Sequence, residues 1–96
     1  MEEQFGIAAF RSRQQVMAFE KALQQSGVRA RIVSTPRAVA AGCGLSVRFE
    51  REDVQAAAEV WRGVRTGNLI GFYEVQRDGG GRLTVRPMGI EAGYSG

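Results

Sequence analysis

The sequence contains no histidine and only one cysteine, Cys43, among its 96 residues. Without histidine there is no imidazole general base, no Cys-His dyad and no histidine metal site. A single cysteine also excludes an internal disulfide and a cysteine-rich zinc site, and an unpaired thiol is typical of a reducing compartment. Cys43 is therefore the one candidate nucleophile with soft chemistry.

Long apolar segments and recognisable targeting signals are also missing. No stretch approaches the roughly 20 apolar residues that a membrane-spanning helix needs. The N-terminus lacks the successive basic, apolar and cleavage-site regions of a signal peptide. Carboxylates do not gather into a catalytic pair, and no glycine-rich loop is followed by the lysine of a phosphate-binding motif. We therefore expect a cytoplasmic protein with no membrane partner, no metal and no cofactor.

The charge of the chain is basic but modest. Thirteen Lys and Arg residues against ten Asp and Glu residues give a formal net charge of +3, and Lys21 is the only lysine. Arginine offers a fixed fork of donors for oxyanions, although codon bias in a GC-rich genome would produce the same excess. A net charge this small does not by itself predict nucleic-acid binding. The 44% hydrophobic content is typical of one globular domain.

The apolar periodicity predicts a β-α-β-β-α-β order of elements. Ser12 and Gln15 have the spacing of a capping box at the start of the first helix, and Gly27 follows its end. The second helix is predicted to begin in the acidic turn 50–53 and to end at the glycines 63 and 67. The other predicted segments are strands over 4–10, 28–34, 45–49 and 69–76, a helix over 13–26, and an optional hairpin strand over 82–86 before a loose tail.

This order of elements predicts an α+β, ferredoxin-like sandwich with an antiparallel sheet of order 4-1-3-2 and both helices on one face. The domain is expected over residues 4–76, with a Gly-rich C-terminal extension over 77–96. Strands one and three are then antiparallel neighbours, so the first ends where the third begins. Cys43 is expected near the start of the first helix, around Arg11 and Arg13.

Two interpretations of Cys43 stay open on the residues alone. A helix N-terminus and nearby arginines such as Arg37 favour the reactive thiolate. Gly42 and Gly44 leave space beside the sulfur for a partner's sulfur to approach. However, free cysteines are among the most buried residues, and a third strand extended back by two residues would put Cys43 on the core face with Leu45.

Binding functions without a reactive cysteine are a separate possibility. RNA-binding modules of the predicted fold stack bases on aromatic residues of the central strands. The third strand offers Ser46 and Arg48 on its outward face instead, which argues against base stacking. Arg29, Arg31 and Arg48 could still form a weak phosphate-binding face. A regulatory module that binds a ligand or partner, or dimerises through its sheet, also stays open.

Two motifs in the first part of the chain resemble those of a known family. Thr35-Pro36-Arg37 is followed by Cys43-Gly44, and the last strand contains Tyr73-Glu74. With the serine before the first helix, these residues resemble a small bacterial domain family labelled as selenium/sulfur carrier protein-like, over about residues 4–76. The loop of that family is often Ser-rich, whereas here it is Ala-Val-Ala-Ala-Gly.

The resemblance implies that Cys43 carries sulfur or selenium as a persulfide-type adduct. A donor such as a cysteine desulfurase would load the thiolate, and an acceptor protein would unload it by thiol exchange. This is the role of a carrier rather than of an independent enzyme, and a homodimer stays open. The alternative is a binding module with Cys43 in the core. The residues implied around Cys43 are Arg37, Ser12, Arg11, Arg13, Thr35, Gly42 and Gly44.

Overall fold

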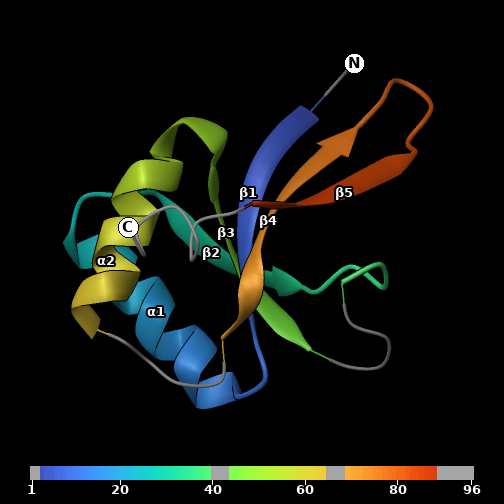
Figure 1. Cartoon of the computed structure of the whole chain (residues 1–96). Helices are drawn as coiled ribbons and strands as arrows, with labels where there is room; N and C mark the ends of the chain where they lie inside the picture. Colours follow the sequence, from blue (N-terminus) through green and yellow to red (C-terminus); the bar gives the residue numbers. More distant parts are fainter. Residues whose placement is uncertain (1–2, 40–43, 65–68, 89–96) are drawn as a thin grey trace.

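The computed structural model describes residues 3–39, 44–64 and 69–88 of the chain. Both described helices lie on one side of a single sheet, which Figure 1 shows nearly edge-on. The elements are β1 (Glu3–Phe10), α1 (Arg13–Gln25), β2 (Ala30–Ser34), β3 (Leu45–Glu50), the 3-10 turn η1 (Arg51–Asp53), α2 (Val54–Val64), β4 (Leu69–Arg77) and β5 (Leu83–Met88).

The sheet is antiparallel throughout and has the order β2-β3-β1-β4-β5, so β1 is its central strand. The predicted α+β class is confirmed. The predicted four-stranded order 4-1-3-2 is not matched as a complete sheet, because β5 pairs with the outer edge of β4 and makes the order 5-4-1-3-2 from that side. Pro87 and Met88, expected in a tail, belong to β5.

The first helix begins and ends for different reasons. Ser12 occupies the N-cap position with an extended backbone, but its side chain makes no capping hydrogen bond, so the predicted capping box is not formed. At the other end the Val28 N–H donates to the Leu23 carbonyl, and Gly27 adopts a φ of 84°. This is a Schellman motif, in which glycine supplies the left-handed residue. Val28, predicted in a strand, therefore belongs to the helix end.

The main core lies between the sheet and the two helices. Val16, Phe19 and Leu23, which recur at steps of three and four along α1, are fully buried there. Phe19 and Phe72 meet edge to face, with ring centroids 6.1 Å apart. Such tilted aromatic pairs stabilise a core beyond the area that they bury. The core thus fixes α1, and with it the start of that helix, against the sheet.

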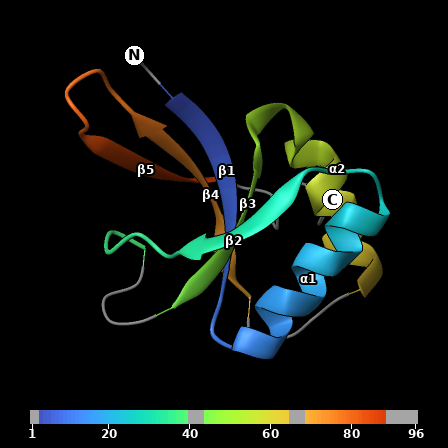
Figure 2. The same cartoon turned by 180° about the vertical axis from the view of Figure 1, so that it is seen from behind.

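A smaller hydrophobic cluster lies on the opposite face of the sheet, away from the helices. Ile7 of β1 and Val75 of β4 are fully buried there although both described helices pack on the other face. Their cover comes in part from Val85 of β5 and from Val39 in the turn after β2. Figure 1 and Figure 2 both show the β4–β5 hairpin and this turn on the side away from the helices. The segment that leads toward Cys43 is thereby anchored to the sheet.

Candidate functional site

Three chain segments meet at one end of the sheet, where β1 and β2 end and β3 begins. Leu45, the first residue of β3, pairs with Phe10 on one side and with Ser34 on the other. Just beyond, the Thr35 N–H donates to the Gly44 carbonyl at 3.0 Å. As expected from the sequence, the end of the first strand lies beside the start of the third.

A pocket of about 430 Å³ opens at this end of the sheet. Four of the residues predicted around Cys43 line this pocket. They come from the start of α1 and from the two ends of the 35–44 segment. Leu45, which packs against the main core, contributes apolar surface, whereas Phe10 is almost fully buried. The lining residues are Phe10, Arg11, Arg13, Ser34, Thr35, Gly44 and Leu45.

Hydrogen bonds hold one wall of the pocket in place. The hydroxyl oxygens of Thr35 and Ser46 lie 2.6 Å apart, and Ser46 is fully buried. A Cβ added to Gly44 would lie 3.4 Å from Thr35 Oγ1, so the two residues are nearly in contact. The sequence places Ser46 on the outward face but gives no sign that it is buried, because the cover over that face comes from distant segments. Ser46 is therefore a supporting residue that sequence reasoning missed.

The pocket carries positive charge that the described residues do not neutralise. Arg11 and Arg13 are exposed, and neither forms an ion pair with another described residue. Among the described residues, no carboxylate lines the pocket. Because guanidinium groups bind oxyanions through charge-assisted hydrogen bonds, this arrangement favours an anionic ligand or adduct.

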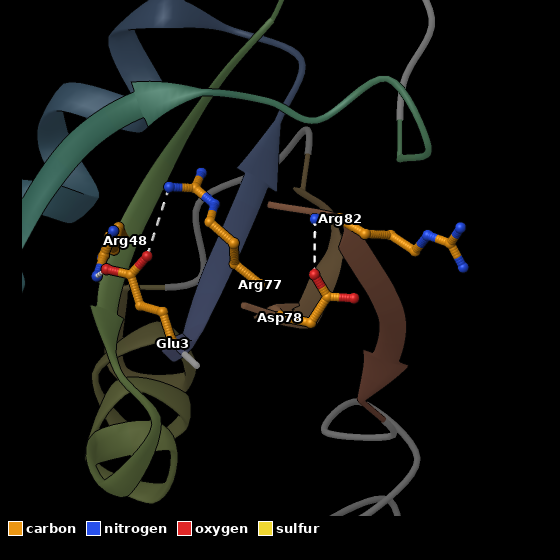
Figure 3. Close-up of polar contacts among 5 residues, drawn as sticks. All are labelled: Glu3, Arg48, Arg77, Asp78 and Arg82. Atoms are coloured by element: carbon orange, nitrogen blue, oxygen red, sulfur yellow. Dashed lines mark hydrogen bonds and ion pairs between the residues drawn. The ribbon is translucent and has the colours of Figure 1, made fainter. Parts of the chain in front are cut away.

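The opposite end of the sheet has the reverse arrangement, in which carboxylates pair with arginines. Glu3 lies between Arg48 and Arg77, as Figure 3 shows. Its nitrogen–oxygen distances to these two arginines are 2.9 and 3.5 Å. Glu74 pairs with Arg51 and Arg86 at 2.6 and 3.7 Å. The hydrogen bond and charge of Arg48 hold the pKa of Glu3 below its ordinary value of 4.5. Charge compensation is thus concentrated away from the pocket.

Two of the other predicted site residues, Arg37 and Ser12, do not line the pocket. Arg37 is exposed in a turn closed by a 2.9 Å hydrogen bond from the Val39 N–H to the Pro36 carbonyl. Ser12 is partly buried at the N-cap of α1. Gly42 and Cys43 lie outside the described residues.

The basic face that could bind phosphate weakly is partly occupied by the protein's own groups. Arg29, Arg31 and Arg48 line a pocket of about 300 Å³ together with Glu50. The Arg48 guanidinium carbon lies 3.8 Å from the centroid of the Phe5 ring. Phe5 is only 7% exposed, so a base cannot stack on it.

No group of three or more His, Cys, Asp or Glu side chains within residues 3–39, 44–64 and 69–88 is arranged to hold a metal ion. In the same part of the chain, no helix has the length and apolar character to cross a membrane.

Comparison with protein families gives one informative match. A family model described as "Putative Se/S carrier protein-like" matches residues 5–66, from β1 to the end of α2. The matched region includes the 35–44 segment, with Cys43 and the lining residues on either side of it. A comparison with curated proteins gives no significant match.

Proposed function

Because the chain belongs to the Se/S carrier protein-like family, which matches 5–66, we propose that it carries sulfur or selenium on Cys43. The observation that supports Cys43 most directly is the pocket at the end of the sheet. Gly44, the residue after Cys43, lines that pocket together with Arg11 and Arg13. A sulfur anion bound to Cys43 would therefore form beside two arginines that have no ion pair among the described residues.

The proposed chemistry is an exchange between a thiolate and a persulfide. The Cys43 thiolate attacks the outer sulfur of a donor persulfide, a new sulfur–sulfur bond forms, and the donor's thiolate leaves with the electron pair. An acceptor thiolate then removes the outer sulfur from Cys43 in the same way. Neither step requires an external oxidant or reductant. A desulfurase-type donor, an acceptor protein and a cytoplasmic location, where thiols stay reduced, complete the proposal.

The neighbouring residues have distinct proposed roles. Arg11, Arg13 and Arg37 supply positive charge that favours the thiolate and persulfide anions over their protonated forms. The start of α1 adds backbone N–H groups that the Ser12 side chain does not cap. Thr35 fixes the position of Gly44 through its N–H. Gly42 and Gly44 leave room for the sulfur of the partner.

The alternative, a binding module with Cys43 in the core, predicts a different reactivity. Iodoacetamide labelling of the native protein, followed by mass spectrometry, separates the two because a core thiol reacts only after unfolding. We expect Cys43 to react in the native protein at a rate comparable to that in denaturant. Labelling confined to denaturant would contradict the carrier proposal and favour the binding module.

A variant pair tests the role of the pocket arginines in this reactivity. We expect Arg13→Gln to slow native labelling near neutral pH because less of the thiol is ionised. Arg82→Gln removes the same charge from the β4–β5 turn, at the opposite end of β4, and serves as the control. Equal rates in the two variants would exclude a specific effect of Arg13.

A further inference from the structure

The donor groups around the pocket all suit one kind of ligand. Arg11 and Arg13 offer guanidinium groups, and Ser34 offers a hydroxyl group, whereas the Thr35 hydroxyl is paired with Ser46. Arginine presents its donors in a fork that matches the oxygens of a planar or tetrahedral oxyanion. A volume of about 430 Å³ is large enough for a small ligand. These groups indicate a small oxyanion rather than a neutral or cationic molecule.

The charge at the pocket is not required by the fold. Arg48, Arg51, Arg77 and Arg86 each form an ion pair with Glu3 or Glu74. Those pairs join β1, η1, β3, β4 and β5 to one another. Arg11 and Arg13 have no such partner among the described residues, although they lie on either side of the N-cap of α1. Two adjacent arginines without a carboxylate repel each other, and a bound dianion would relieve that repulsion.

The pocket also has an apolar side. Leu45 is only partly buried against the main core and presents apolar surface, whereas Phe10 is 1% exposed. Both line the pocket beside the arginines. An anion covered entirely by oxygen would leave this apolar surface unmatched. An anion with one polarizable, weakly hydrated sulfur atom could place that atom against Leu45 and its oxygens toward the arginines.

We propose that this pocket binds a sulfur oxyanion with a terminal sulfane sulfur, of which thiosulfate is the simplest. This inference rests on the proposed function, in which Cys43 accepts a sulfur atom. The Cys43 thiolate would attack the sulfane sulfur, the sulfur–sulfur bond of thiosulfate would break, and sulfite would leave with the electron pair. The reactants, a thiolate and thiosulfate, together carry a charge of −3, and so do the products, a persulfide anion and sulfite. Arg11 and Arg13 would hold the oxygens of the departing sulfite.

Binding can be measured apart from transfer with the full-length Cys43→Ser protein. We expect saturable binding of sodium thiosulfate to one site in isothermal titration calorimetry. Arg11→Gln and Arg13→Gln, each in the Cys43→Ser background, should each weaken the binding by on the order of ten-fold, as loss of a charge-assisted hydrogen bond does. Arg82→Gln, which makes the same change of net charge, should leave the dissociation constant nearly unchanged. Absence of saturable binding, or an equal effect of all three variants, would overturn the inference.

Sulfate and a persulfide donor distinguish this inference from the function on which it rests. Sulfate lacks the sulfane sulfur, so it should bind more weakly than thiosulfate, and equal affinities would overturn the role of the apolar side. The protein with Cys43 intact should gain one sulfur from thiosulfate and release sulfite in equal amount. If it gains sulfur from a persulfide donor but neither binds thiosulfate nor gains sulfur from it, the oxyanion inference fails while the carrier function stands.

Discussion

Gly6 of β1 faces Phe49 of β3, and the phenyl ring occupies the space where a side chain at residue 6 would project. A Cβ at this position would lie 2.8 Å from Phe49 Cζ and closer still to Cε1. Phe49 is 1% exposed and packs in the main core, so its ring has little room to move. We expect Gly6→Ala to lower the free energy of unfolding by about 1–3 kcal/mol through overpacking, measured by urea denaturation.

Gly63 provides the matched control for this substitution. It is exposed in α2, and a Cβ there would meet nothing within 4 Å. Because alanine favours a helix over glycine, Gly63→Ala should raise the free energy of unfolding by up to about 1 kcal/mol. Equal effects of the two substitutions would contradict the close packing of Phe49 on Gly6.

The hydroxyl pair of Thr35 and Ser46 gives a second prediction at the residue scale. Thr35→Val keeps the shape of the side chain but leaves the fully buried Ser46 hydroxyl without this partner. We expect a loss of about 1–3 kcal/mol in the free energy of unfolding, measured by urea denaturation. Thr84→Val, at an exposed position of β5, should change it by less than about 0.5 kcal/mol.

A double variant checks the origin of that loss. Thr35→Val combined with Ser46→Ala removes both hydroxyls, so no buried side-chain hydroxyl is left without its partner. The combined loss should be smaller than the sum of the two single losses, as for residues in direct contact. Additive losses would show that the hydrogen bond does not couple these residues.

Among the elements, the central strands are joined at one end by an ion-pair network. Glu3 of β1 binds Arg48 of β3 and Arg77 of β4. The pKa of Glu3 is lowered chiefly by its hydrogen bond with Arg48. A carboxylate with a lowered folded-state pKa stabilises the fold above its ordinary pKa of 4.5, and this contribution is lost as the pH falls through the lower value.

Glu3→Gln should therefore destabilise the protein most near neutral pH. The difference in urea midpoint between this variant and the native sequence should shrink as the pH is lowered below 4.5. The effect will be modest because Glu3 is exposed to solvent, and it should weaken further in salt. Glu59→Gln, which removes a carboxylate at an exposed position of α2, controls for the change in net charge. A difference that does not change with pH would contradict the role of the network.

The elements differ in how well the sequence predicts them, for physical reasons. The β1, β3 and β4 strands and α1 follow strong apolar periodicity, and their predicted bounds are within about two residues, the usual error for element ends. β2 starts at Ala30 rather than at Val28 because the Schellman motif takes Val28 into the helix end. β5 is mostly exposed and has a weak apolar pattern, so the sequence predicts this hairpin strand only as an optional one.

For the whole molecule, the sequence predicts the meeting of the strand ends but not the packing around it. Antiparallel neighbours must bring the end of β1 to the start of β3, so Arg11 and Gly44 could be expected together. The second hydrophobic cluster and the burial of Ser46 depend on residues distant in the chain, such as Val39 and Val85. Periodicity within one strand contains no information about such cover. The location of the pocket and part of its lining were therefore predictable, but the packing that supports it was not.

The central claim is that Cys43 accepts and releases a sulfur atom, and intact-mass spectrometry tests it directly. The native protein is incubated with a persulfide-loaded cysteine desulfurase and its mass compared with that of Cys43→Ser treated in the same way. The account predicts that the native protein gains one sulfur, that Cys43→Ser gains none, and that an acceptor thiol removes the added sulfur. A native protein that never gains sulfur, or a Cys43→Ser protein that gains as much, would contradict it.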